Sequence, residues 1–226
     1  MNPYKFNFSA TVIYTFLLII SIQSLLNGQD RYTQIQIGSQ MMQNYNLGEL
    51  IFLENYFYKY EEKSQRVATT FNHDISVTRT FDQHHGVTVG GGIYTTGRYV
   101  GLKLSSDNYL FLTDNFESFF KNFTLYCMYQ YTTQLSTRLS GHLSAGPMWA
   151  RNYNEEDWFY LPVKLNYFSA LAKLGVQYNV ADHFSIALHG VVVRSMTNIV
   201  DPKYNRTEGA LIPFSVGADL RVGYKF

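Results

Sequence analysis

Three things that many proteins use are scarce in this 226-residue chain: cysteine, net charge and long apolar runs. The single cysteine, Cys127, excludes an intrachain disulfide, and its distance from the N-terminus excludes a lipoprotein anchor. We interpret it as a small hydrophobe on an apolar strand face. The 18 Lys and Arg against 17 Asp and Glu give a charge of +1, which provides no reason to expect nucleic acid as a partner.

Motifs that would hold a cofactor or a metal are missing as well. The sequence has no phosphate-binding glycine loop, no Gly-x-Ser-x-Gly elbow and no Cys/His metal set. We interpret His84 and His85 as solvated residues of a tight turn. We therefore expect neither a cofactor nor a metal.

The one continuous apolar run covers residues 10–22. Lys5 precedes it, and the small and polar residues Asn27, Gly28 and Gln29 follow it. This order predicts a cleaved signal peptide over residues 1–28 and an exported mature chain over residues 29–226. With no other apolar run long enough for a membrane helix, a mature chain embedded in a membrane would have to be a closed β-barrel.

The composition favours such a barrel. Aromatic residues make up 17% of the chain, with 19 Tyr, while charged residues make up only 15%. A typical globular domain has about 25% charged residues. Tyrosine and phenylalanine gather in the girdles of membrane barrels, where a ring is half in water. A Tyr-rich soluble β-sandwich is the alternative.

The last segment, residues 210–226, has the clearest period of two. Its even positions are all apolar and its odd positions from Pro213 onward are mostly small or charged, which predicts one long strand. Six further segments alternate in the same way, at residues 69–81, 87–94, 119–131, 137–151, 166–180 and 184–196.

Short links alternate with longer polar ones between these strands. The short links are residues 82–86, 132–136 and 181–183, and the longer ones are residues 61–66, 101–118, 152–157 and 199–208. This pattern predicts an all-β, antiparallel up-and-down transmembrane β-barrel. Residues 50–60 as first strand give eight strands, which we prefer because residues 101–118 then stay one loop. Strands at residues 31–42 and 97–104 would give ten.

Eight strands leave an interior that side chains fill. The inward positions carry charges of both signs, so we expect a buried network in which opposite charges meet. Its expected members are Asp74, Arg138, His189, Asp219 and Arg221.

The signal peptide, the alternating strands, the unequal links and the terminal aromatics Tyr224 and Phe226 together resemble the small bacterial outer-membrane β-barrels, the class of the OmpX-like and OmpA-transmembrane barrels. The resemblance implies an outer-membrane location in a Gram-negative-type cell and contact with outer-membrane lipid and lipopolysaccharide. It also implies that the barrel-assembly machinery recognises Tyr224 and Phe226 during insertion. That class contains anchors, adhesins, channels and enzymes. We favour a structural or interaction role through the outer loops, with a narrow channel as an alternative.

A second resemblance concerns chemistry. His142 and Ser144 lie two apart on one strand face, with Glu156 further on, and this set resembles the His, Ser and Glu of the lipid A deacylase barrels. A His-oriented Ser suits ester hydrolysis. The asparagine that follows the serine in that family is Ala145 here. A lipid A-modifying esterase is therefore a further alternative.

Overall fold

The computed structural model describes residues 32–46, 50–55, 58–66, 68–106, 109–153, 164–199, 207–209 and 212–226. Over these residues the chain forms eleven strands in one antiparallel sheet. No helix in these ranges is long and apolar enough to cross a membrane. The strands are β1 (Thr33–Asn46), β2 (Leu50–Asn55), β3 (Tyr58–Arg66), β4 (Ala68–Thr80), β5 (His85–Ser106), β6 (Tyr109–Gln134), β7 (Leu139–Asn152), β8 (Asn166–Asn179), β9 (Phe184–Ser195), β10 (Thr207–Gly209) and β11 (Pro213–Lys225).

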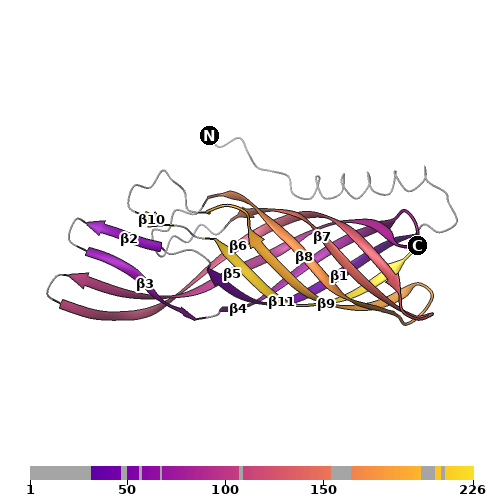
Figure 1. The fold of residues 1–226 in the computed structure, drawn as a ribbon, viewed down its shortest axis with the longest axis horizontal. Coiled ribbons are helices and arrows are strands. Elements are labelled where there is room, and N and C mark those ends of the chain that lie inside the picture. Colours follow the sequence, from indigo (N-terminus) through magenta and orange to yellow (C-terminus); the bar gives the residue numbers. More distant parts are fainter. Residues whose placement is uncertain are drawn as a thin grey trace.

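Eight of these strands close into a barrel (Figure 1). Around the wall they follow in the order β5, β4, β1, β11, β9, β8, β7 and β6, and pairing of β5 with β6 closes the ring. The last strand meets the first, with Gln34 opposite Lys225 and Asn46 opposite Pro213. The predicted all-β, eight-stranded, up-and-down barrel is confirmed.

The two ends of the barrel differ. The links at residues 81–84, 135–138 and 180–183 are tight, and they lie at the same end as the C-terminus (Figure 1). We call this the turn end. In the first of these links, Asp82 Oδ1 accepts hydrogen bonds from the backbone N–H groups of His84 and His85, both at 2.7 Å. These bonds hold the pKa of Asp82 below its ordinary value.

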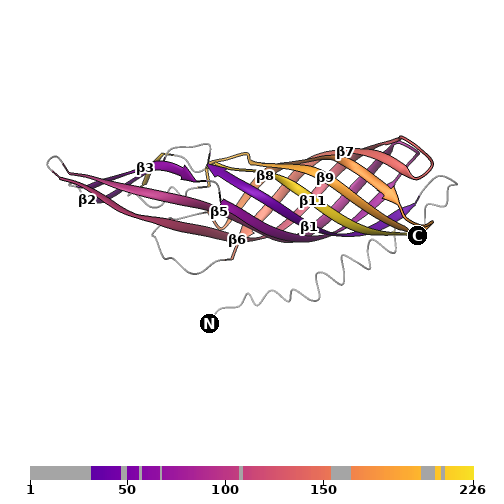
Figure 2. The same cartoon turned by 90° about the horizontal axis from the view of Figure 1, so that it is seen from below.

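At the other end the sheet continues beyond the barrel. β5 and β6 are 22 and 26 residues long, against 12 to 14 for most wall strands. Their far halves project as a long hairpin, and β3, β2 and β10 add to it beside β5 (Figures 1 and 2). We call this part the outer sheet.

The first strand of the barrel corrects one prediction. It is β1, which covers most of the alternative range 31–42 and extends to Asn46, whereas the described residues of 50–60 belong to β2 and β3 of the outer sheet. The reason is visible in the pattern: β1 alternates buried Gln34, Gln36 and Gln40 with exposed Ile37 and Met41, and residues 50–60 do not alternate cleanly. A wall strand between lipid and lumen must alternate.

The outer link at residues 101–118 corrects a second prediction. Its described residues belong to β5 and β6, so it is a paired hairpin and not a polar loop. Residues 97–104 continue β5 and add no wall strand. Residues 61–66, expected as a polar link, likewise form most of β3.

The wall has polar side chains inside and apolar ones outside, the reverse of a soluble protein. On β11, Asp219 is 0% exposed and its neighbour Leu220 is 54% exposed. Outward positions on the other strands are similarly apolar, including exposed Cys127 on β6. Such a wall faces hydrocarbon, and this excludes the soluble β-sandwich.

Aromatic rings border the apolar wall at both ends. At the turn end, Tyr224 contacts Phe184 and Phe226 with ring centroids 5.1 and 4.9 Å apart. At the opposite end, the rings of Phe123 and Trp149 lie 6.5 Å apart. These rings form the two girdles that the composition predicts.

Candidate functional site in the barrel lumen

Four charged side chains meet in the middle of the lumen. Asp74 comes from β4, Lys173 from β8, and Asp219 and Arg221 from β11. Arg221 lies 2.6 Å from both Asp74 Oδ2 and Asp219 Oδ2, measured from Nη2 and Nε respectively. Lys173 Nζ lies 2.8 Å from Asp219 Oδ2 and 3.6 Å from Asp74 Oδ2. The four side chains are at most 7% exposed and carry no net charge, so each ion is compensated.

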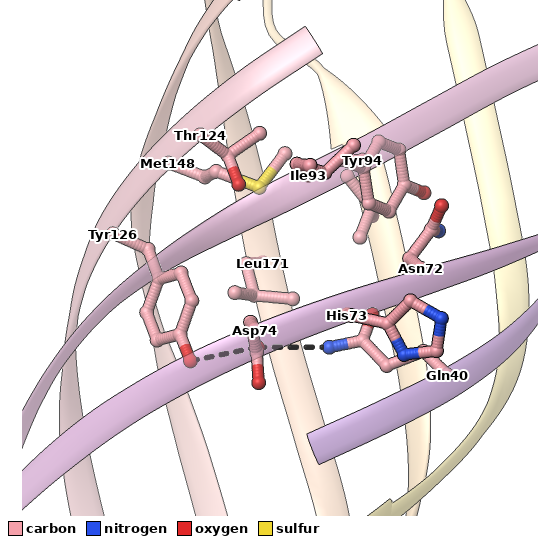
Figure 3. Close-up of a pocket in the computed structure, with 11 residues that line it drawn as sticks. Gln40, Asn72, His73, Asp74, Ile93, Tyr94, Thr124, Tyr126, Met148 and Leu171 are labelled. Atoms are coloured by element: carbon pink, nitrogen blue, oxygen red, sulfur yellow. Dashed lines mark hydrogen bonds between the residues drawn. The ribbon is translucent and has the colours of Figure 1, made fainter. Parts of the chain in front are cut away.

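Neutral groups complete the hydrogen bonding of this ion cluster. Tyr126 Oη and Gln40 Nε2 donate to Asp74 Oδ2 at 2.8 and 3.0 Å (Figure 3). Arg221 Nη1 donates to Ser76 Oγ at 2.8 Å. Such hydrogen bonds offset the free-energy cost of burying the ions. Without them, the carboxylate lone pairs and the guanidinium protons would lose water and gain no partner.

Inward-facing glycines make room for the cluster. A Cβ on Gly38 would lie 2.7 Å from Asp74 Oδ1 and 3.0 Å from Arg221 Cζ. A Cβ on Gly90 would lie 2.5 Å from the Tyr126 hydroxyl oxygen. The absence of side chains at these two positions allows the large polar groups to cross the narrow lumen.

Two further layers fill the lumen on either side of the ion cluster. Toward the turn end, Gln36 Nε2 donates to Gln177 Oε1 at 3.2 Å and Gln34 Nε2 donates to Ser185 Oγ at 2.5 Å. Toward the outer sheet lies an apolar cluster rich in methionine, beside buried polar residues such as Asn72 and Thr124; its members include Met42, Tyr94, Met148, Leu171, Val191 and Val193. Side chains therefore fill the interior, as an eight-stranded barrel requires.

Known proteins share this fold. No family model matches the chain, and no curated protein matches it. Among solved structures it is similar to the outer-membrane protein AlkL, with a TM-score of 0.50 at 13% identity, over 89% of this chain and 93% of AlkL. It also aligns with the N-terminal barrel domain of Pseudomonas aeruginosa OprF, at a TM-score of 0.45 and 12% identity over 88% of this chain and all of that domain. Neisserial surface protein A aligns at 0.44 and 13% over 87% and 99% of the two chains.

The chain is a closed eight-stranded barrel of the small outer-membrane type. At these identities the likeness shows the fold alone.

The structure brings together three of the predicted network residues, Asp74, Asp219 and Arg221. It adds Lys173, whose inward position on β8 was readable from the alternation, although the prediction left it out. His189 is buried beside them on β9, opposite Asp219, and its Nδ1 has no hydrogen-bond partner among the described residues.

Arg138 is not part of the ion cluster. It is exposed in the tight turn before β7, which begins at Leu139. The parity of Arg138 matches the inward set, but the strand has ended there and the side chain no longer points into the lumen. The predicted strand, residues 137–151, therefore began two residues too early.

His142 and Ser144 are both buried in the lumen, but they are not hydrogen-bonded to each other. His142 Nε2 is hydrogen-bonded to Ser140 Oγ at 2.8 Å, and its Nδ1 lies 3.0 Å from Gln130 Nε2. Among the described residues no hydrogen bond links His142 to Ser144, and Glu156 lies outside those residues. A base that activates a serine must reach its hydroxyl, so His142 and Ser144 do not form a nucleophile–base pair in this geometry. The described residues also contain no cluster of His, Cys, Asp or Glu that could hold a metal.

Tyr224 and Phe226 lie on the lipid-facing side of β11 at the turn end. Phe226 is 63% exposed, and its backbone N–H donates to Thr33 O at 2.9 Å, on the neighbouring first strand. The terminal aromatics are therefore accessible from the lipid side, at the point where the barrel closes.

Proposed function

We propose that this protein is an exported outer-membrane barrel with a closed lumen, which acts through its outer sheet in a structural or interaction role. Export would follow cleavage of the predicted signal peptide at residues 1–28. The fold supports the outer-membrane location, because its apolar wall and paired girdles suit a bilayer and nothing else in the described chain covers them.

The observation that carries the proposal is the filled lumen. An ion moving along the axis would have to separate the pairs of Arg221 with Asp74 and Asp219, and then cross the apolar layer around Met148 and Leu171. Charge transfer through such an apolar layer is unfavourable. We therefore favour an interaction role over a narrow channel.

The outer sheet supplies a surface for partners. Residues 109–120 of β6 pair with β5 on one side, while pairing with β7 begins only at Asn122. Among the described strands, none covers the other edge of this segment. An open strand edge presents backbone donors and acceptors that can pair with an extended segment of another protein.

Charge at the barrel rim supports contact with lipopolysaccharide. Lys121, Arg151 and Arg194 are exposed on the outward face toward the outer sheet. The turns at the opposite end carry Asp82 and Asp182 together with Arg138. Basic side chains bind phosphate through charge-assisted hydrogen bonds, so the basic rim suits the phosphorylated leaflet. Recognition of Tyr224 and Phe226 by the barrel-assembly machinery belongs to the same proposal.

Two measurements test it. In a planar bilayer, the purified protein should show no steady open-pore conductance, and sustained conductance would favour the channel. In intact cells carrying Cys127→Ser, a membrane-impermeant maleimide should label Thr197→Cys, an exposed position just after β9 at the outer-sheet end, and should not label Asp82→Cys until the cells are permeabilised. The reverse labelling, or soluble periplasmic protein, would overturn the proposed placement.

A further inference from the structure

The wall has a seam between β4 and β5. Their ladder runs from Thr80 opposite Gly86 to His73 opposite Ile93 and then stops. Beyond it, residues 68–72 pair only with β1 and residues 94–98 only with β6, until β3 meets β5 again at Arg66 opposite Tyr99. Among the described residues, one hydrogen bond crosses this seam, from the Thr95 N–H to Asn72 Oδ1 at 2.7 Å.

A small pocket lies at the base of the seam (Figure 3). Most of its lining faces the lumen, including Asn72, Asp74 and Tyr126, while lipid-facing His73 and Ile93 also line it, so the pocket borders the wall where the ladder stops. Its volume is about 10 Å³, which is room for about one water-sized group. A single oxygen atom fits there without rearrangement of the layer behind it.

Asn72 offers that oxygen a donor. The side chain is 2% exposed, and Nδ2 has no hydrogen-bond partner among the described residues. Because Oδ1 already accepts from Thr95, the amide orientation is fixed and Nδ2 remains as a donor. A buried donor without an acceptor costs about 1–3 kcal/mol, so an incoming acceptor would be favoured.

The seam lies where acyl ester groups are found in a bilayer. Phe71, 66% exposed, and Ile93, 54% exposed, are the last large apolar residues on the outward faces of β4 and β5 before Thr69 and Thr95. The hydrocarbon region therefore ends at this level, and the chemistry changes to that of the interface, where the esters of lipid chains lie. An acyl chain resting on Phe71 and Ile93 would bring its carbonyl to the pocket mouth.

We propose that the β4–β5 seam is a docking site for an acyl ester of the outer leaflet, whose carbonyl oxygen enters the pocket and accepts a hydrogen bond from Asn72 Nδ2. The chain itself stays on the lipid face. This inference goes beyond the proposed function, since it requires neither a partner on the outer sheet nor an open lumen.

Methyl NMR of the purified barrel in detergent tests the site, with methyl octanoate as the ester and n-decane as a hydrocarbon of similar length. Met148 lines the pocket, while Met41 and Met196 face lipid and serve as internal controls. We expect methyl octanoate to shift the Met148 methyl signal saturably, and n-decane to have no saturable effect on it. Equal, non-saturable shifts at all three methionines would mean partition into detergent only and would overturn the proposal.

Two matched pairs of variants locate the binding. Asn72→Leu should weaken methyl octanoate binding about tenfold, as expected for loss of one hydrogen bond. Asn44→Leu, another buried asparagine toward the outer sheet, should not. Val193→Phe should abolish the saturable shift by filling the pocket, and lipid-facing Val192→Phe should leave it unchanged. Heat-modifiable migration on gels verifies folding of each variant. Unchanged affinity in both Asn72→Leu and Val193→Phe would show that the pocket holds a water molecule only.

Discussion

The two faces of β11 share one backbone but have different surroundings, the polar lumen on one side and lipid on the other. Its inward residues Asp219 and Arg221 are buried among partners of opposite charge, while the neighbouring Leu220 and Val222 are exposed. In a soluble protein the exposed face would carry the charges. The difference shows that exposure in this fold reports contact with lipid, and that the stability of polar residues depends on pairing in the lumen.

The largest expected effect comes from the end of that outward face. Deleting Phe226 should strongly reduce the yield of assembled barrel, because the terminal aromatic is the proposed recognition element for insertion. Heat-modifiable protein in outer-membrane fractions measures this yield. Lys225→Ala removes the adjacent side chain, which donates to Asn179 Oδ1 in the lumen, and should leave most of the yield intact. A normal yield of the Phe226 deletion would show that the terminal aromatic residue is not needed for assembly.

Breaking the ion cluster should cost the most stability on the inward face. Arg221→Ala leaves Asp74 and Asp219 with Lys173 as their one remaining cation in the cluster, and should lower the free energy of unfolding by about 3–5 kcal/mol. Urea titration of the purified barrel measures it. Exposed Arg194→Ala is the matched control and should change little. Equal losses for both would mean that water reaches the cluster and would raise the channel alternative.

Placing a charge on the outward face tests the other half of the comparison. Leu220→Lys should destabilise the barrel by about 2–4 kcal/mol in a lipid bilayer, since a cation near the middle of a lipid-facing strand is poorly solvated. Leu135→Lys puts the same charge in an exposed turn and should have a small effect. Comparable unfolding curves for the two variants would argue against a hydrocarbon environment around β11.

The smallest expected effect concerns Asp82, whose carboxylate lies in a turn and belongs to neither face of the wall. The N–H groups of His84 and His85 lower the pKa of Asp82, so the ionised form is favoured in the folded state. Its contribution should be present at neutral pH and be lost as the pH falls through the lowered pKa. Asp82→Ala should therefore melt slightly below wild type at pH 7, and the two melting temperatures should converge in acid. A constant difference at all pH values would exclude this cause.

Much of the barrel was predictable because alternation is a local property. Residues 210–226 identified β11, and the inward parity of Asp74, Asp219 and Arg221 placed them in the lumen. Their meeting could only be expected in general terms, since it depends on the register between strands far apart in sequence.

The failures share a physical reason. Arg138 has inward parity but precedes the first residue of β7, and strand boundaries are set by turn geometry and not by polarity. Residues 50–60 are rich in aromatics, which composition cannot distinguish from a wall strand. The seam between β4 and β5 depends on where a ladder of non-local hydrogen bonds stops, and neither strand carries a local signal for it.

The pairing of β1 with β11 has a consequence for the order of folding. Every other neighbouring pair in the wall is separated by a shorter stretch of chain, whereas Gln34 and Lys225 lie near the two ends of the described residues. Before these strands meet, the wall is an open sheet with exactly two free edges, and its apolar side has no partner but lipid. Free edges promote aggregation. We therefore expect closure to be the last event, and a factor that shields the free edge of β11 until β1 pairs with it would protect the chain from aggregation.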